Sequence, residues 1–420
     1  MRPDPGAPRS SSARYWPEID LLRAIAGVLM IANHAAVTWL PESGSRGGLI
    51  GAIGFVGSLA PVLFFTVTGL GRGIQAAAGR ARSPLSDSLR KGLVLLIADA
   101  ALWLSPDRHF GLDFLGFIGL STVVLEILDR TRRPVATIAF ATIACLALRF
   151  AVAPRLGLRP EGGVLVQALH FVLGDASVTG VSYPLCPWLA YPLSGWLVGR
   201  FAGVRADRVR ESRGLSALLL AGLATCGLGL CLVMFRRHMV FFRWGTLSFA
   251  YYALGFTAVI GGMALVLGAV KLLPRTLTGF LGLPGIASFV LVPIHYALIG
   301  ITRPLFMHHG LDRVMGHGEA AFPFALLALA PVAIALSKWI DRRMQSLTRA
   351  ARKQPAIAVL LVATLALLIA KLETRNLDVQ GLLRLIVQLL ATSLFVLSSR
   401  PRTGTNDPSD SKTVTNAGLV

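Results

Sequence analysis

The sequence predicts an all-α, polytopic integral membrane protein with about twelve transmembrane helices and with both termini in the cytoplasm. Three observations predict this fold class. Hydrophobic residues make up 54% of the 420 residues and charged residues only 15%, whereas soluble domains carry about 25% charged residues. Apolar runs long enough to cross a bilayer recur from Ile19 to Ser398. Lys and Arg gather in short loops on one side of these runs.

The apolar runs define the predicted helices in order. The third run is short for a bilayer, so we expect that helix to begin earlier or to tilt. Residues 163–176 are too short to span, and counting them as a span would invert every later loop. We therefore expect a re-entrant or interfacial segment there, on the outer side. The expected spans are 19–40, 50–71, 91–104, 112–129, 134–153, 183–199, 214–234, 247–270, 279–301, 320–338, 354–371 and 378–398.

These spans predict one transmembrane domain, residues 19–398, between a cytoplasmic N-terminal segment, 1–18, and a disordered cytoplasmic tail, 399–420. The net charge of +20 follows from the cation-rich loops on the side of the two termini, as in an inner-membrane protein.

The aromatic residues form no stacking platform, so we expect no nucleic-acid partner. The four cysteines lack CxxC spacing and are interpreted as small core side chains, and no metal is expected.

Arg23 and His34 lie on the first predicted helix with ten residues between them. Eleven steps of about 100° return His34 to within roughly 20° of the face that carries Arg23, about 16 Å further along the axis. An imidazole near mid-depth thus shares a stripe with a cation near the surface, and ionisable groups at that depth are commonly functional. His34 would be a base or a transient acyl carrier, and Arg23 would hold an anionic group. The alternative is a snorkelling Arg and a His bonded to a neighbouring helix. Asp20 either orients Arg23 or ends the helix at the interface.

The run from Glu18 to His34, EIDLLRAIAGVLMIANH, resembles the opening helix of two related groups of membrane enzymes. These are the acyltransferases of the acyltransferase-3 type and the heparan-α-glucosaminide N-acetyltransferase-like proteins. Ala24 stands where their pattern has Gly, and Thr68 where it has Ser. Further segments resemble theirs in the same order: Ala60–Gly69, Ser88–Leu93, Asp113–Leu120, Tyr183–Gly195 and Val292–Tyr296.

The resemblance implies an enzyme that moves an acyl group, with acetyl favoured, from cytoplasmic acyl-CoA to a hydroxyl or amine. The acceptor would be a glycan, a glycolipid or a secreted metabolite. Arg72, Arg90 and Lys91 at the inner surface would dock the coenzyme A phosphates together with Arg23, although positive-inside topology alone also explains these cations. Asn33 and Thr68 would contact substrate, with helix packing the favoured role around Thr68.

Five further residues are candidates for the site, each with an alternative. Asp99 would orient an imidazole, relay a proton or bind substrate, or else pair with Arg149 or Arg384. His295 is a second catalytic imidazole, an acceptor ligand or a helix-packing group. Trp188 would stack on a sugar ring or anchor the interface. His170 and Asp175 would line an acceptor site or belong to a solvated loop.

Two other functions compete with acyl transfer. Twelve spans with cytoplasmic termini suit a secondary transporter or a flippase-like carrier, although the loop after residue 70 lacks Gly-x-x-x-Asp-Arg and we find no matching halves. A non-catalytic assembly component is the third hypothesis. The sequence is compatible with a homo-oligomer in the bilayer.

Overall fold

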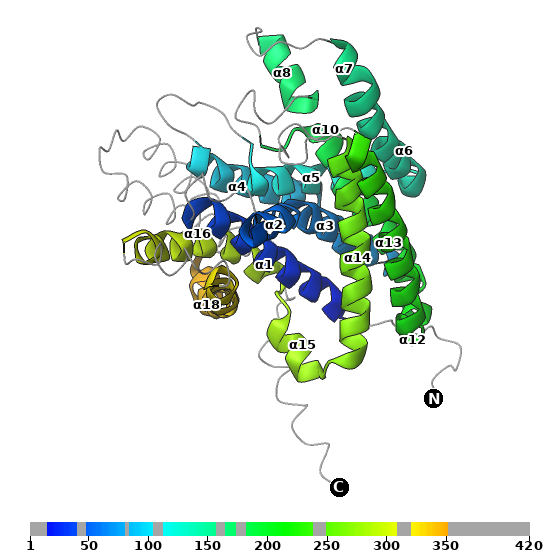
Figure 1. Cartoon of the computed structure of the whole chain (residues 1–420). Helices are drawn as coiled ribbons and strands as arrows, with labels where there is room; N and C mark the ends of the chain where they lie inside the picture. The colour runs from blue at the N-terminus through cyan, green and yellow to red at the C-terminus, as the bar shows by residue number, and fades with distance from the viewer. Residues whose placement is uncertain are drawn as a thin grey trace, which may run out of the picture.

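The computed structural model describes residues 15–39, 48–79, 84–103, 112–156, 164–173, 182–237, 249–308 and 321–351. These residues form helices joined by turns and short segments, with no β-strand among them, which confirms the expected all-α class (Figure 1). The predicted spans 354–371 and 378–398 and the tail 399–420 lie outside the described residues.

Helices are present at each of the first ten predicted spans. In chain order they are α1 (Pro17–Trp39), α2 (Gly48–Gly57), α3 (Ala60–Ala77), α4 (Leu85–Trp103), α5 (Phe114–Asp129), α6 (Pro134–Ala147), the π-helical η1 (Leu148–Val152), α7 (Ala153–Leu156), α8 (Val164–Leu173), α10 (Leu185–Trp188), α11 (Ala190–Val204), α12 (Ala206–Glu211), α13 (Arg213–Arg237), α14 (Phe249–Leu272), α15 (Arg275–Leu281), α16 (Gly285–His308) and α18 (Ala321–Ala351).

Several of these helices are long and apolar enough to cross a membrane, so the chain is a multi-pass membrane protein. Within the described residues they are Pro17–Trp39, Leu49–Ala77, Pro134–Leu156, Arg213–Val233, Phe249–Leu272 and Phe322–Arg343, with Ala287–Thr302 as a shorter apolar helix. The short third run does begin earlier than its apolar core, at Leu85. Residues 164–173 form a helix of ten residues, and its position relative to the membrane stays a prediction.

The predicted span 50–71 is two helices rather than one. α2 ends at Gly57, and α3 begins at Ala60 with Pro61 in its first turn. Proline lacks an N–H and fits where that donor has no helical partner, so it favours a new helix start here. The hydroxyl of Ser58 donates to the carbonyl oxygen of Phe55 at 2.6 Å within the turn. The break exposes polar backbone beside α1, at the place where the site forms.

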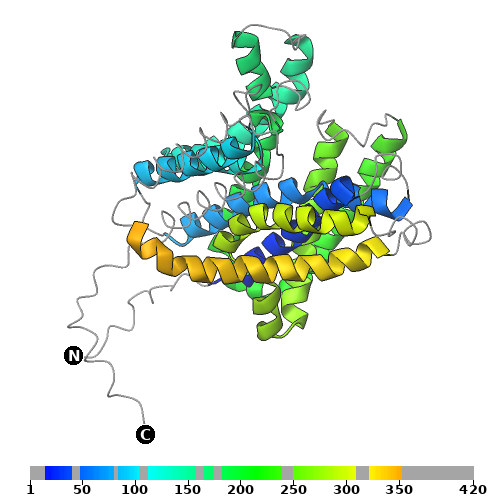
Figure 2. The same ribbon diagram turned by 90° about the vertical axis from the view of Figure 1, so that its left-hand side faces the viewer.

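α1 occupies the centre of the bundle. It packs against α2, α3, α14, α16 and α18, and α18 lies along α16 on one side of it (Figure 2). On the other side α3 packs very closely against α11, because Gly69 and Gly195 face the opposing backbone. A Cβ at Gly69 would overlap the carbonyl of Pro192, and one at Gly195 would overlap the carbonyl of Thr66. Small residues permit this approach between apolar helices.

Candidate active site

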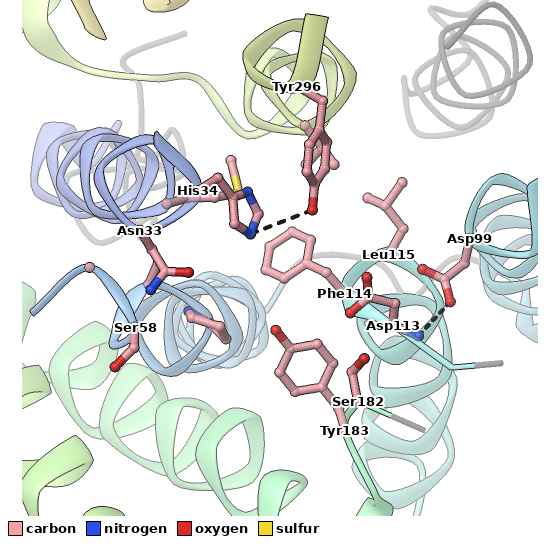
Figure 3. A pocket seen from close by; sticks show the side chains of 15 residues that line it. Asn33, His34, Ser58, Asp99, Asp113, Phe114, Leu115, Ser182, Tyr183 and Tyr296 are labelled. Carbon is pink, nitrogen blue, oxygen red and sulfur yellow. Dashed lines mark hydrogen bonds between the residues drawn. The ribbon is translucent and has the colours of Figure 1, made fainter. Parts of the chain in front are cut away.

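A cavity of about 250 Å³ lies between the C-terminal half of α1, the α2–α3 turn, α4, the start of α5, residues 182–183 and α16. Most of its wall is apolar. His34 and the two carboxylates, Asp99 and Asp113, lie on opposite sides of it (Figure 3). Such a cavity is the expected form of a small-molecule site. The polar and aromatic residues that line it are Asn33, His34, Ser58, Asp99, Asp113, Phe114, Ser182, Tyr183 and Tyr296.

Two imidazoles meet at one side of the cavity. Nδ1 of His34 on α1 lies 2.7 Å from Nε2 of His295 on α16, and the rings stack with centroids 4.9 Å apart. His295 is fully buried, whereas His34 lines the cavity. A buried imidazole bonded to His34 fits both a second catalytic imidazole and a helix-packing group, and its role stays a prediction.

The hydrogen bonds of this pair determine which nitrogens carry protons. Nδ1 of His295 lies 3.0 Å from the carbonyl oxygen of Leu291, one turn earlier on α16. A carbonyl only accepts, so in the neutral pair this Nδ1 is protonated and Nε2 is not. The bare Nε2 of His295 then accepts the Nδ1–H of His34. Nε2 of His34 is left unprotonated, as a base or nucleophile requires, and its one hydrogen-bonding contact among the described residues is a long one of 3.5 Å from the Tyr296 hydroxyl.

Tyr296 lies over the same imidazole. Its ring stacks on that of His34 with centroids 4.7 Å apart, and its hydroxyl lies 3.5 Å from Nε2 of His34 (Figure 3). A phenol near this nitrogen can donate to a group that binds there. The polar groups on this side of the cavity are therefore a lone pair and an O–H donor, close together.

Carboxylates occupy the opposite side of the cavity. Asp99 on α4 is 1% exposed, and its Oδ2 accepts the backbone N–H of Asp113 at 2.6 Å. Asp99 thus reaches the N-terminus of α5, which favours negative charge. Its Oδ1 is buried and has no hydrogen-bond partner among the described residues. Arg149, one of its expected partners, donates instead to the carbonyl of Leu173 at 2.6 Å, and Arg384 lies outside the described residues.

Three other predicted substrate contacts have different surroundings. Asn33 lines the cavity and donates from Nδ2 to the carbonyl of Gly54 at 2.9 Å. The hydroxyl of Thr68 donates to the carbonyl of Phe64 at 2.9 Å, within α3. Trp188 is fully buried and packs edge-on against Phe65 and Tyr183 behind the cavity wall. His170 lies on α8, and its side chain, like Asp175, is outside the described part of the chain.

Arg23 and Asp20 lie together near the start of α1, away from His34. Nη1 of Arg23 donates to Oδ1 of Asp20 at 2.6 Å, and the Tyr15 hydroxyl donates to Oδ2 at 2.8 Å. The carboxylate therefore orients Arg23, one of the two expected roles. Burial and the hydrogen bond to Asp20 raise the pKa of Tyr15 to about 12, so this phenol stays a donor. The Arg23 side chain is 21% exposed.

The remaining predicted donor-site cations gather around Glu126, which sequence reasoning did not single out. Arg72 donates to Oε2 of Glu126 at 2.6 Å, and Arg130 donates to Oε1 at 2.8 Å. Arg90 pairs with Asp87 at 3.1 Å, and Lys91 lies close enough to Arg72 and Arg90 to be affected by their charges. Arg72, Arg90 and Lys91 thus lie in one region of the molecule, where Glu126 and Asp87 neutralise part of their positive charge.

Asp113, Ser182, Tyr183 and Tyr296 are cavity residues to which the sequence assigned no role. Asp113, Tyr183 and Tyr296 do belong to segments that carry the family resemblance, which is the signal that could have found them. Within the described residues, no group of three or more His, Cys, Asp or Glu side chains is arranged to hold a metal.

An apolar helical bundle with two hydrogen-bonded imidazoles beside a cavity defines a multi-pass membrane protein with a candidate site for a small molecule. The family model for heparan-alpha-glucosaminide N-acetyltransferase, catalytic, matches residues 14–240, more than half of the chain. The chain therefore belongs to this family of membrane acetyltransferases, as its motifs predicted. No curated protein and no solved structure matches the chain significantly.

Proposed function

We propose that this protein transfers an acetyl group from cytoplasmic acetyl-CoA to an amine or hydroxyl of a glycan, glycolipid or secreted metabolite bound in the cavity. The observation that carries the proposal is the hydrogen-bonded chain from Leu291 through His295 to His34, which leaves Nε2 of His34 unprotonated at the cavity wall, 3.5 Å from the Tyr296 hydroxyl. The family match supports the reaction class.

His34 performs the proton transfer in this mechanism. As the acceptor nitrogen or oxygen attacks the thioester carbonyl, Nε2 takes the proton that the acceptor loses, and it then returns that proton to the departing thiolate of coenzyme A. His295 holds the ring in the required tautomer and stabilises the transient imidazolium, because its bare Nε2 accepts the Nδ1–H of His34. The same lone pair could attack the thioester and carry the acetyl group on His34, which is a two-step route.

Tyr296 supplies a donor for the charge that develops on the carbonyl oxygen. Its hydroxyl is 3.5 Å from Nε2 of His34, so a carbonyl carbon attacked next to this nitrogen has its oxygen within reach of the phenol. Donors aimed at a developing oxyanion contribute strongly in a site that excludes water. The apolar remainder of the cavity wall provides such a site.

The carboxylates opposite His34 bind the acceptor. Oδ1 of Asp99 is buried and has no hydrogen-bond partner in the described part of the chain, and both Asp99 and Asp113 line the cavity. A buried carboxylate needs a donor or a cation, and an acceptor amine or hydroxyl supplies one. The bound acceptor then lies between the carboxylates and the base.

The donor enters from the cytoplasmic end of α1. Arg23, about 16 Å from the level of His34 along the helix, binds a phosphate of coenzyme A, assisted by Arg72, Arg90 and Lys91. The pantetheine arm bridges that distance to the cavity. This arrangement assumes the inner-membrane topology proposed from the loop charges, with about twelve spans and with both termini in the cytoplasm.

The test is acetyl transfer by the purified protein in proteoliposomes, with radiolabelled acetyl-CoA as donor. Glucosamine serves as an amine probe and N-acetylglucosamine as a probe that offers only hydroxyls, and release of the coenzyme A thiol is followed in parallel. We expect label on a sugar, and a loss of about 10²- to 10⁴-fold in His34→Gln. Cys226→Ser, at an exposed position, is the matched control. A wild-type rate in His34→Gln would contradict the proposal, and flux of sugar without donor would favour a carrier.

A further inference from the structure

Two cysteines that are distant in sequence lie in contact beside the cavity wall. Cys145 is near the end of α6, and Cys186 is in α10, 41 residues later, with the two Sγ atoms 3.0 Å apart. Both side chains are buried. The Sγ of Cys145 also lies 3.7 Å from the carbonyl of Leu185, so Cys145 packs directly against α10.

We propose that Cys145 and Cys186 form a disulfide bond that joins α6 to the cavity wall. The sulfurs need to approach by about a further 1 Å to reach the bond length of roughly 2.05 Å. The two other cysteines, Cys226 and Cys231, both lie on α13.

The bond forms by thiol–disulfide exchange with a disulfide-bearing thiol oxidoreductase of an oxidising compartment. One thiolate attacks the oxidant's disulfide, which gives a mixed disulfide and releases one thiol of the oxidant. The second cysteine, after it loses its proton, displaces the other thiol. The protein thiols lose two electrons and two protons, and the oxidant's disulfide becomes a dithiol. Because both cysteines end up buried, exchange takes place before α10 docks on α6. The inference rests on the proposed topology, which puts Cys186 at the outer end of its span.

The bond would fix the part of the chain that forms one wall of the cavity. Tyr183, three residues before Cys186, lines the cavity, and the N–H of Ser182 donates to the carbonyl of Leu112 at 2.9 Å, next to Asp113. Trp188, two residues after Cys186, packs against Tyr183 with ring centroids 4.9 Å apart. A cross-link at Cys186 therefore restrains the residues that hold Tyr183 and the start of α5 in position.

The test measures the covalent state of each cysteine in the full-length protein. Cells are lysed in denaturant with N-ethylmaleimide, the protein is reduced, and new thiols are labelled with isotopically heavy N-ethylmaleimide before peptide mass spectrometry. We expect light label on Cys226 and Cys231 and heavy label on Cys145 and Cys186. Light label on all four cysteines would overturn the proposal.

Single serine variants check that the two cysteines are partners. In Cys145→Ser, Cys186 should take the light label, and the reverse holds for Cys186→Ser, whereas Cys226→Ser leaves the pattern unchanged. Heavy label that persists on Cys186 in Cys145→Ser would also overturn the proposal.

Reduction should lower the thermal midpoint of the wild-type protein by about 5 °C and should leave that of the Cys145→Ser variant unchanged. Labelling does not depend on acetyl transfer, so failure of the proposed activity and failure of the disulfide are separate results.

Discussion

The Nδ1 atom of His34 lies 2.7 Å from Nε2 of His295, although the two residues are 261 positions apart in the chain. This contact joins the first helix to α16 at the cavity. It gives the His34 ring a defined tautomer, because the ring of His295 is itself held by the carbonyl of Leu291.

His295 is a positioning residue, and its replacement should lower turnover without abolishing acceptor binding. His295→Ala removes the acceptor for the Nδ1–H of His34, and we expect kcat to fall about 100-fold. His295→Gln should recover part of the rate, since an amide oxygen can accept that hydrogen. The pH profile of kcat should shift in His295→Ala and should stay close to wild type in His295→Gln. Equal rates and profiles in the two variants would show that His295 only fills space.

Tyr296→Phe should lower kcat by about 10- to 100-fold and leave the KM for both substrates nearly unchanged, because the hydroxyl is used in the transition state. The ring stacking on His34 is kept in this variant. Steady-state release of coenzyme A at varied donor and acceptor concentrations measures the two parameters separately. A change confined to KM would assign Tyr296 to substrate binding instead.

Asp99→Asn should raise the KM for glucosamine by about 10-fold, equivalent to about 1.4 kcal/mol, because the neutral amide attracts an ammonium group less strongly. Gly116→Ala should act in the same direction, since its Cβ would lie 2.6 Å from Oδ2 of Asp99 and would displace that carboxylate. The control is Gly222→Ala, where a Cβ meets no atom within 4 Å. Unchanged KM in both test variants would remove Asp99 from the acceptor site.

Arg23→Ala should raise the KM for acetyl-CoA by about 10-fold at unchanged kcat, because the guanidinium is proposed to bind a phosphate and lies far from the reacting atoms. Arg213→Ala is the matched control, since Arg213 is also near the start of α1 but pairs with Glu18 at 2.8 Å. The same increase in both variants would indicate a general effect of surface charge.

Gly69→Ala should destabilise the protein by about 1–3 kcal/mol, because the added methyl would overlap the backbone carbonyl of Pro192 and push α3 away from α11. Thermal unfolding in detergent should show a midpoint lower by several degrees, while Gly222→Ala should unfold at the wild-type temperature or slightly above it. An unchanged midpoint in Gly69→Ala would mean that the two helices separate without cost.

The sequence predicted helices well because apolar runs depend on local composition, and the first ten expected spans all contain helix. It predicted one span over 50–71 and missed the break before α3, because this run is mostly apolar and the proline at 61 is a weak signal for a new helix start. The Arg23–His34 spacing pointed to α1, and His34 on this helix does line the cavity. Its partner could not be deduced, because the contact with His295 depends on how α1 and α16 pack.

The same limit applies to the other contacts between helices. The positive-inside rule predicts that Arg72 lies at the inner membrane surface. Its hydrogen bond to Glu126, 54 residues later, is seen only in the packed structure. Likewise, no spacing pattern connects Cys145 with Cys186. The family match ends at residue 240, before His295 and Tyr296, so the site combines residues inside and outside the matched region.

The hydrogen bond from His295 to the carbonyl of Leu291 has a consequence for energy coupling. A backbone carbonyl can neither accept nor pass on a proton under catalytic conditions, so the imidazole pair has no exit away from the cavity. The proton taken from the acceptor can therefore leave His34 only through the cavity, and in the proposed mechanism the departing thiolate takes it up there. Acetyl transfer at this site should therefore be electroneutral, and a transmembrane voltage or pH gradient should neither drive it nor oppose it.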